Sequence, residues 1–511
     1  TFNLLSTNDG GIYLSKSSKQ PGHQDMDFEY VSMSYNTAQF YSADKMPGEN
    51  RYIGGMQDNG TYLTPQGETS NASTAFDFAI GGDGFEVLWN NRDPQKVIGS
   101  IYYNRFYVSS DGGVSWKTAQ DGIIAQDGPF LSRLANSRSY PDRVYAISQN
   151  GIYISNNFGE NWSLSSITSD AWVFSNYTDV EVSAADAKII WAGGYMSEDY
   201  RLFVSSDKGL TFTPTETYSD YPNMGPVTTL GSHPSDPNTA FAIFSFDGLP
   251  KILKTEDLGQ TWLDISGFDP ATGLSDRGFP NVASHSFFCF PNNPDRIWVG
   301  TEIGIIETLN GGDSWALLNS NMPMVNIFDM KIQDDQVVIA TYGRGIWSVT
   351  IPEIQQEILF APNIEQVSIH PEGIMTIALS YSNLFDSTQI LIDDDLIHSI
   401  GMQDLGLVSI DLDNLNLTGV ENIKTLAYKD GKSYESVESQ VLLYEVFDVK
   451  TSYSTNFSGA YSQLAFSGFT TGFESGFSNA ALHTSHPHPS SKELIAILKT
   501  PIQVKESEAI L

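Results

Sequence analysis

One eight-residue pattern recurs five times along the chain and constrains its fold more than any other feature. It reads hydroxyl residue, any residue, Asp or Asn, any residue, Gly, two further residues and an aromatic residue. The Asp or Asn side chain can accept backbone N–H groups and close a turn, and the glycine supplies the positive φ that the turn needs. The aromatic residue can then fill the gap between neighbouring sheets. The copies span residues 109–116, 155–162, 205–212, 255–262 and 308–315.

The spacing of these copies, about 45–50 residues, predicts an all-β propeller with one four-stranded sheet per repeat. An aromatic content of 12% and 43 glycines suit such a turn-dense protein. Counting strand-like runs favours seven blades over the alternative of eight. We therefore assign residues 1–351 to the propeller.

The first and last repeats depart from this pattern. The early strand-like runs at residues 11–15 and 59–64 lack a proper turn motif, and the final unit at residues 337–347 stops after its third strand. We expect an early segment, Phe28–Met33, to close the ring. Residues 1–25 are then free to reach into a neighbouring propeller.

The repeats end at Pro352, and a different β pattern follows. Alternating apolar runs over residues 352–446 favour an immunoglobulin- or fibronectin-like sandwich. Residues 447–511 are too few for more than part of a further β-sandwich. The chain begins with Thr1 rather than Met, and we expect both ends to continue in a longer protein.

The charge balance restricts the partners. The 61 acidic residues against 27 basic ones give a net charge of −34, which argues against nucleic acid and anionic membranes because both require basic surface. No apolar run of 18 or more residues occurs, so no membrane insertion is expected. The single cysteine, Cys289, lies in an apolar run and is interpreted as a small core residue.

Adjacent hairpins of a blade turn at opposite faces, so the turns between second and third strands should lie opposite the motifs. Reading these turns around the ring predicts a rim rich in carboxylates, although Asp or Asn beside Gly is also ordinary turn chemistry. The predicted ligand-binding residues are Asp9, Gln57, Asp58, Asn59, Asp83, Glu86, Arg105, Glu302, Tyr342 and Arg344.

The repeated motif resembles the Asp-box (BNR) repeat of sialidases, sortilin-type propellers and family 74 glycoside hydrolases. The turn at residues 8–13 is similar to a turn of family 74 enzymes that carries a catalytic aspartate, which makes Asp9 a candidate acid or base. Asp58 and Asp83 are further candidates for a paired-carboxylate mechanism. In that family the two carboxylates come from two propellers, so the partner of Asp9 would lie outside this chain.

The runs at residues 54–61, 81–86 and 342–347 are similar to large secreted Bacteroidota proteins that carry a type IX secretion signal. This resemblance implies an extracellular or cell-surface location and a secretion or outer-membrane partner.

Metal and cofactor chemistry is not indicated. The histidines at residues 483–488 lie in a proline-containing stretch, and the acidic run at residues 393–395 is typical of a solvated turn. No phosphate loop, basic patch or Ser/His/Asp spacing is legible, so we expect no cofactor and no metal.

Three functions remain open. The leading interpretation is a propeller whose acidic face binds a carbohydrate or protein ligand. The second is a glycoside hydrolase similar to xyloglucanases, and the third is a structural spacer in a larger secreted protein.

Overall fold

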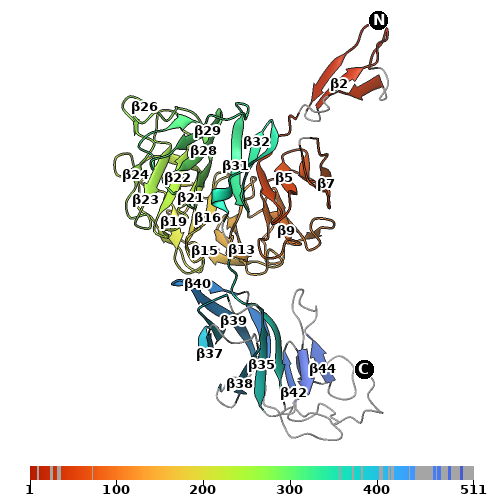
Figure 1. Cartoon of the computed structure of the whole chain (residues 1–511), viewed down its shortest axis with the longest axis vertical. Coiled ribbons are helices and arrows are strands. Elements are labelled where there is room, and N and C mark those ends of the chain that lie inside the picture. Colours follow the sequence, from red (N-terminus) through yellow and green to blue (C-terminus); the bar gives the residue numbers. More distant parts are fainter. Residues whose placement is uncertain are drawn as a thin grey trace. The chain divides into compact units, whose positions relative to one another are not determined.

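The computed structural model divides the chain into two compact units, Thr1–Ile358 and Leu359–Leu511 (Figure 1). The described residues are 1–8, 11–22, 27–31, 36–71, 73–355, 358–370, 373–380, 384–401, 407–412, 415, 419–436, 438–443, 464–467, 469–472, 481–484 and 495–498. Within these ranges the regular structure is mainly β-strand, and a 3₁₀ turn, η2 (Pro352–Ile354), follows the last strand of the first unit. No helix in the described part of the chain is long and apolar enough to cross a membrane.

The first three strands form a sheet of their own. β1 (Leu5–Asn8) pairs with β2 (Gly11–Ser15), which pairs with β3 (Phe28–Tyr30). The expectation that Phe28–Met33 closes the ring is therefore wrong for its described part, because Phe28–Tyr30 pairs with β2 instead.

Between residues 42 and 350 the described chain forms seven antiparallel sheets arranged as a β-propeller. The first strand of each sheet contacts the first strand of the next, and β31 of the last sheet contacts β4 of the first, which closes the ring. The last sheet has three strands, as the sequence predicted. The first four sheets comprise β4 (Ser42–Lys45), β5 (Tyr52–Met56), β6 (Gly60–Leu63) and β7 (Asp77–Ile80); β8 (Val87–Trp89), β9 (Val97–Ile101), β10 (Arg105–Ser109) and β11 (Lys117–Thr118); β12 (Leu134–Ser137), β13 (Tyr140–Ser148), β14 (Gly151–Ser155) and β15 (Ser163–Ser166); and β16 (Asp179–Val182), β17 (Ile190–Gly193), β19 (Phe203–Ser205) and β20 (Thr213–Pro214).

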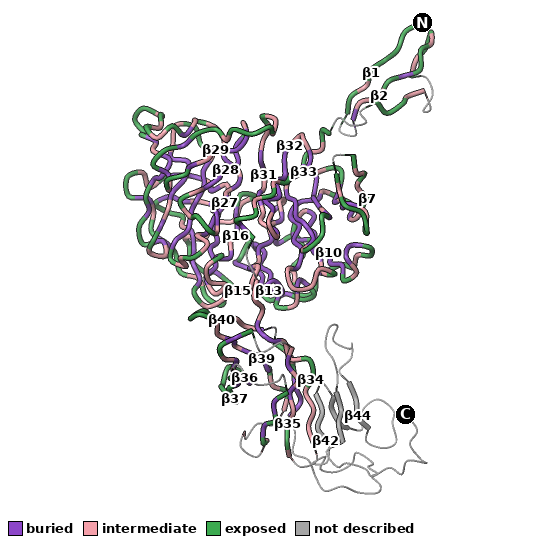
Figure 2. Tube along the Cα trace, in the orientation of Figure 1, coloured by how far each residue is buried: buried purple, intermediate pink, exposed green. Residues whose placement is uncertain are grey.

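The remaining sheets follow the same plan. They comprise β21 (Gly225–Ser232), β22 (Ala240–Phe244), β23 (Ile252–Thr255) and β24 (Leu263–Asp264), with β18 (Tyr195–Met196) added beside β21; β27 (Ser284–Cys289), β28 (Ile297–Thr301), β29 (Gly304–Thr308) and β30 (Ala316–Leu317); and β31 (Asn326–Gln333), β32 (Gln336–Tyr342) and β33 (Gly345–Thr350). A short hairpin of β25 (Phe268–Asp269) and β26 (Leu274–Ser275) precedes β27. Buried residues follow the strands of the ring and exposed residues its connections (Figure 2).

The five repeated motifs fold into the same turn. In the first, Asp111 Oδ1 accepts the N–H groups of Val114 at 3.0 Å and Ser115 at 2.9 Å, and Ser109 Oγ accepts the Gly113 N–H at 2.8 Å. The equivalent hydroxyl accepts the glycine N–H in the other four copies. The motif glycines have φ between 81° and 101°, a region that residues with a Cβ rarely adopt.

The motif tryptophans join neighbouring sheets. Trp262 Nε1 donates to Glu216 O at 2.9 Å, and Trp315 Nε1 donates to Ile265 O at 2.8 Å. Trp162 makes the same kind of bond to Ala119 O at 3.1 Å. Each acceptor follows the last strand of the preceding sheet, so the predicted gap-filling role is confirmed for these three residues. Trp116 differs, because its Nε1 donates to Gly113 O within its own motif.

Every motif also bonds to the first turn of its own sheet. Gly112 N–H donates to Gln95 O at 2.8 Å in the second sheet, and Phe158 N–H donates to Asp142 O at 2.7 Å in the third. Equivalent bonds join Lys208 to Lys188, Leu258 to Asn238 and Gly311 to Asp295. We call this end of the ring the motif face, and the opposite end, where second and third strands turn, the rim face.

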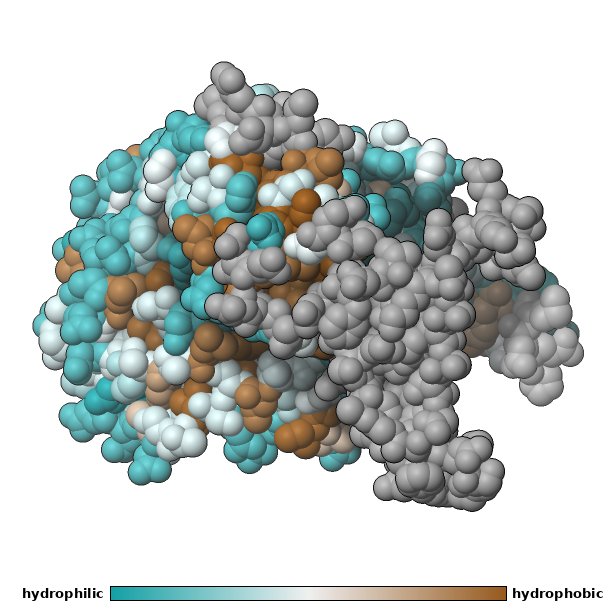
Figure 3. Space-filling view, turned by 90° about the horizontal axis from the view of Figure 1, so that it is seen from below, coloured by the Kyte–Doolittle hydropathy of each residue, from teal (hydrophilic) through white to brown (hydrophobic). Residues whose placement is uncertain are grey.

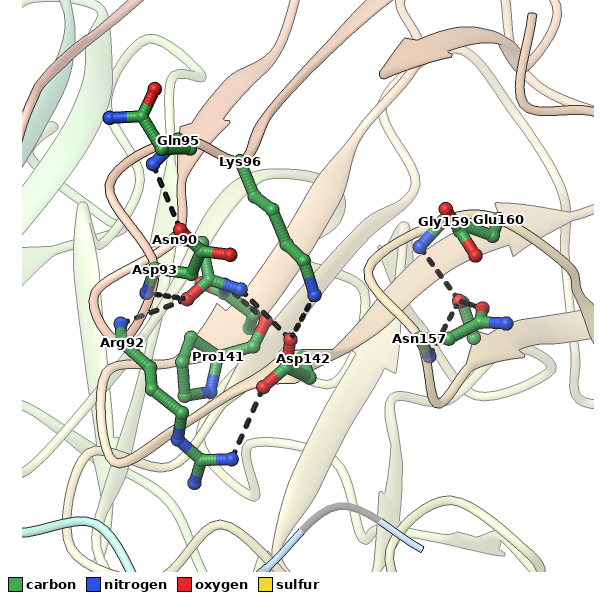
Figure 4. A network of polar contacts seen from close by, with 12 residues as sticks. Asn90, Arg92, Asp93, Gln95, Lys96, Pro141, Asp142, Asn157, Gly159 and Glu160 are labelled. Carbon is green, nitrogen blue, oxygen red and sulfur yellow. Dashed lines mark hydrogen bonds and ion pairs between the residues drawn. The ribbon is translucent and has the colours of Figure 1, made fainter. Parts of the chain in front are cut away.

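A polar network ties two sheets together on the motif face (Figure 4). The Asp142 carboxylate accepts Asn90 Nδ2 at 3.1 Å, Arg92 Nη1 at 3.3 Å and Lys96 Nζ at 3.4 Å. These donors lie in the first turn of the second sheet, whereas Asp142 belongs to the third sheet. The three donors compensate the negative charge of the Asp142 carboxylate, which is nearly buried.

Charged side chains line the axis of the ring. Lys331 Nζ lies 2.8 Å from Asp329 Oδ2 and also pairs with Glu86, while Arg133 Nη1 lies 3.6 Å from the other oxygen of Glu86. The first and last sheets meet here, since Ser42 Oγ donates to Asp329 Oδ2 at 2.8 Å. The segment just before β4 also bonds to the last sheet, since Phe40 N–H donates to Thr341 O at 3.0 Å, and an apolar cluster that includes Phe40, Ala43 and Val338 spans the junction.

In the second unit, two antiparallel sheets enclose a common apolar core. One contains β34 (Ile364–Ile369), β35 (Ile374–Leu379) and β38 (Leu407–Asp411); the other contains β36 (Ser387–Ile392), β37 (Asp395–Gly401), β39 (Gly419–Lys429), β40 (Lys432–Glu435) and β41 (Ser439–Leu443). Further along, β42 (Leu464–Ser467) pairs with β45 (Ile495–Leu498), and β43 (Phe469–Gly472) pairs with β44 (Ala481–Thr484).

On the face of the molecule drawn in Figure 3, hydrophilic residues dominate the periphery and hydrophobic residues form patches between them, in keeping with a chain of only 17% charged residues.

Candidate binding site on the rim face

Two of the predicted acidic residues meet on the rim face. Asp58 lies in the turn between β5 and β6 with φ 63°, and its N–H donates to Asp83 Oδ1 at 2.8 Å. The loop that carries Asp83 is held against the same turn, because Gly84 N–H donates to Met56 O at 2.9 Å. Asp58 is exposed and Asp83 is half-buried. No ion pair between described residues involves either carboxylate.

An arc of aromatic rings starts beside this pair. Tyr41 contacts Phe85 edge to face at 5.2 Å between ring centroids and Phe328 at 5.1 Å. Phe328 stacks on Tyr342 at 5.0 Å. Phe328 also stacks on the imidazole of His285 at 5.0 Å. Each of these residues lies at the rim end of its sheet or just before the inner strand, as the strand registers place them.

The arc continues in the other direction past the second sheet. Phe85 contacts Phe130 at 5.4 Å, and Phe130 contacts Tyr103 at 5.7 Å and stacks on Tyr102 at 6.1 Å. We call the eight residues Tyr41, Phe85, Tyr102, Tyr103, Phe130, His285, Phe328 and Tyr342 the aromatic arc. Tyr103 is 39% exposed and Phe85 only 2%. The arc therefore combines a buried base with accessible rings.

Tyr41 connects the arc to the acidic pair. Its hydroxyl donates to Gln57 Oε1 at 2.8 Å. Burial, the neighbouring Tyr342 and the charges of Asp58 and Asp83 raise the pKa of Tyr41 well above its usual value. The hydroxyl therefore remains a neutral donor.

Several buried polar atoms at this end of the ring have no hydrogen-bond partner within the protein. They are Thr61 Oγ1, Ser284 Oγ, His285 Nε2 and Asn326 Oδ1. Thr61 and Ser284 are completely buried, and the registers place all four next to rim turns. Burial lowers the pKa of His285, so its imidazole is neutral near pH 7. Buried polar atoms of this kind normally bond to water or to a ligand.

The other predicted residues occupy the rim in different ways. Asn59 Nδ2 donates to Gln57 O at 3.2 Å within the first turn, and Arg105 Cζ lies 5.4 Å from the centre of the Tyr102 ring. Glu302 is exposed and its Oε1 accepts the Ala283 N–H at 3.2 Å. Arg344 Nη1 donates to Gly343 O at 2.6 Å, next to Tyr342.

Glu86 lies elsewhere. It is 6% exposed and belongs to the ion-pair network on the ring axis, where its Oε1 lies 2.7 Å from Ser42 Oγ. Two other carboxylates of the inner strands have raised pKa values because burial disfavours their charge: about 8 for Glu181 and about 6 for Asp44. Ser232 Oγ donates to Glu181 Oε1 at 2.8 Å. These groups lie inside the ring rather than on the rim.

The remaining predictions concern Asp9, metal binding and the single cysteine. Asp9 lies outside the described residues, as do residues 485–488 of the His-containing stretch. Among the side chains that the structure describes, no group of three or more His, Cys, Asp or Glu residues could hold a metal ion. Cys289 is mostly buried, and burial raises the pKa of its thiol to about 12, which makes it a poor nucleophile.

The sequence did not reveal the aromatic arc. Its members come from positions as far apart as Tyr41 and Tyr342, and in the sequence most of them read as ordinary strand residues. A usable signal exists: an aromatic residue directly precedes an axial acid in both Phe85-Glu86 and Phe328-Asp329, at equivalent places in two repeats.

Comparisons with solved structures find distant similarities. A GH74 enzyme from Niastella koreensis is 15% identical, with a TM-score of 0.44, over 66% of this chain and 46% of that chain. A GH74 xyloglucanase from Xanthomonas campestris is 15% identical, with a TM-score of 0.43, over 66% and 47%. The extracellular domain of a hybrid two-component system from B. thetaiotaomicron is 9% identical, with a TM-score of 0.43, over 86% and 68%.

This chain thus spans less than half the length of the two GH74 enzymes. No model of a protein family matches the sequence, and no curated protein matches it.

Proposed function

We propose that the rim face of the propeller binds carbohydrate, with the rings of the aromatic arc as stacking surfaces. The observation that carries this proposal is the arc itself, because its rings are contributed by separate sheets and converge at one end of the ring. Accessible Tyr rings combine an apolar face with a polar hydroxyl. Such surfaces suit sugar rings, which present C–H groups on their faces and hydroxyls at their edges.

The polar groups around the arc supply the second element of such a site. Ligand sites typically combine an apolar surface with a few placed hydrogen-bonding groups. Here these are the Asp58 and Asp83 carboxylates, together with the unpartnered Ser284 Oγ, His285 Nε2 and Asn326 Oδ1. A sugar hydroxyl both donates and accepts, so it can satisfy either kind of atom.

A wider setting follows from the same proposal. We place the protein outside the cell or on a bacterial surface, with a secretion or outer-membrane partner. We also propose that residues 1–25 belong to a neighbouring propeller, together with β3, which pairs with β2. Several large apolar residues remain exposed on this sheet, including Leu5 at 65% and Tyr30 at 44%, and a small sheet of this kind is marginally stable without further packing.

The test is a titration of neutral β-linked hexasaccharides against the wild type and two matched variants. Tyr103→Ala removes an accessible ring of the arc, and Tyr30→Ala removes a comparably exposed ring from the β1–β3 sheet. Removing a ring that contacts ligand should weaken binding at least about five-fold, since anchoring residues contribute more than 1 kcal/mol. Unchanged affinity in Tyr103→Ala, or an equal loss in Tyr30→Ala, would refute the site.

Hydrolysis is the second candidate, and one observation favours it: Asp58 and Asp83 are adjacent and flank an accessible surface. Glycoside hydrolysis uses a pair of carboxylates about 5–10 Å apart. Incubation with the bound hexasaccharide and measurement of new reducing ends decides between binding and cleavage. Cleavage that disappears in Asp58→Asn and in Asp83→Asn would establish an enzyme, and stable substrate would leave a binding protein.

A further inference from the structure

We infer that the rim site prefers glycans that carry protonated amino groups, such as polymers of glucosamine, over neutral and acidic glycans. This inference rests on the proposed carbohydrate-binding function and adds the chemical class of the ligand. Its basis is the unpaired acidic group beside the aromatic arc.

The acidic pair presents negative charge that the protein does not neutralise. Asp83 Oδ1 accepts the Asp58 N–H, which leaves Asp83 Oδ2 and both carboxylate oxygens of Asp58 without a hydrogen bond to another described residue. No Lys, Arg or His of the described chain pairs with either group. Some other carboxylates of the described chain are paired: Asp334 with Lys45, Asp142 with Arg92, and Glu307 with Arg296.

The aromatic arc adds a second attraction for a cation. The Tyr41 ring is close enough to both carboxylates for their charges to raise the pKa of its hydroxyl. It also contacts Tyr342 at 5.6 Å. A cation over an aromatic face gains about 0.5–1 kcal/mol at exposed sites. An ammonium group beside Asp58 and Asp83 can therefore be held by carboxylates and ring faces together.

Unpartnered polar atoms lie at the same end of the ring. Thr61 Oγ1 is completely buried and lies under the loop that carries Asp83, against Gly84. Ser284 Oγ, completely buried in β27, likewise lacks a partner. A sugar brings hydroxyl groups as well as its amine, and these hydroxyls can both donate and accept hydrogen bonds at the surface of this end of the ring.

Acidic residues outnumber basic ones in the remaining rim turns. The rim turns between second and third strands also contain Glu198, Asp199, Asp247 and Glu302, all exposed. Arg105 lies over Tyr102 at the far end of the arc, and Arg344 lies beside Tyr342. The chain carries a net charge of −34, so an acidic glycan meets an unfavourable field.

The experiment compares three hexasaccharides with the same linkage: β-1,4-linked glucosamine, its N-acetylated form and the corresponding neutral glucan. Titrations with the full chain are done at about pH 5.5, where the amine is protonated and exposed carboxylates are ionised. We expect the glucosamine hexamer to bind about ten-fold more tightly than either neutral hexamer. High salt should reduce this preference, because exposed charges are screened.

Asp58→Asn and Asp83→Asn should each weaken binding of the glucosamine hexamer about two- to five-fold more than binding of the neutral hexamers. The matched control is Asp313→Asn, an exposed acid on the motif face, which should leave the preference unchanged. Equal binding of all three hexamers overturns this inference but leaves carbohydrate binding intact. Failure of every hexamer to bind overturns both, and tighter binding of a lysine-rich peptide of equal charge assigns the site to a protein ligand instead.

Discussion

Replacing single motif tryptophans tests whether the repeated turns stabilise the ring by joining adjacent sheets. Trp262 is 6% exposed, donates to Glu216 O at 2.9 Å and contacts Trp191 at 6.3 Å between centroids. Trp116 occupies the same motif position, but it is half-buried and donates only to Gly113 O at 3.1 Å. Comparing the two replacements therefore distinguishes the stability that comes from the turn itself from the stability that comes from the contact between adjacent sheets.

Large-to-small replacement of a buried aromatic residue costs about 3–5 kcal/mol. Trp262→Ala should lower the free energy of unfolding by that amount, because it also leaves Glu216 O without its donor. Trp116→Ala should cost about 1–2 kcal/mol, since a half-buried ring loses less apolar contact. Both values are differences from the wild type under the same conditions.

The assay is equilibrium unfolding in urea followed by far-UV circular dichroism, which does not depend on the fluorescence of the replaced residue. The two transitions of the two units are fitted separately. Both replacements should act on the transition of Thr1–Ile358. A cost for Trp116→Ala equal to or larger than that for Trp262→Ala would refute the reasoning.

Three further outcomes are expected. Gly259→Ala should destabilise the ring more than Gly48→Ala in the same urea assay. Both glycines have positive φ, but only a Cβ added at Gly259 meets another residue, the side chain of Thr215 at 2.4 Å. Equal losses of unfolding free energy would contradict this expectation. Glu181→Gln should stabilise the ring more at pH 8 than at pH 5. In the folded wild type, burial raises the pKa of Glu181 to about 8, whereas the same carboxyl in the unfolded chain loses its proton near about pH 4.3. The stability of the wild type therefore falls as the pH rises through that interval. An effect of Glu181→Gln that does not depend on pH in urea melts would contradict this. Deleting residues 1–31 should shift the melting temperature of the ring by only a few degrees, since β1, β2 and β3 pair with one another; loss of the ring transition in calorimetry would show that this sheet supports the ring.

The sequence was most informative about local turns. The Asp or Asn, the hydroxyl and the glycine of each motif act within eight residues, so their roles follow from residue chemistry alone. The same reasoning placed Asp58 on the face opposite the motifs, because strand alternation decides the end at which each turn lies. The three-stranded last sheet was also predicted, since the repeat pattern stops in the sequence itself.

Long-range contacts were not predictable in this way. Phe28–Tyr30 pairs with β2, the strand that precedes it in the sequence. Closure of the ring, by contrast, brings together residues from its two ends, such as Ser42 and Asp329. Glu86 looked like a rim residue because it follows a glycine-rich turn. Glu86 instead directly precedes the inner strand β8, and its side chain lies on the axis of the ring. There the ammonium group of Lys331 compensates its negative charge.

A crystal structure of the full chain with a bound hexasaccharide tests most directly whether the aromatic arc binds carbohydrate. We expect sugar rings against the accessible faces of Tyr102, Tyr103 and Tyr342, with one unit beside Asp58 and Asp83. Sugar bound instead on the motif face beside Trp116, or within Leu359–Leu511, would contradict the account.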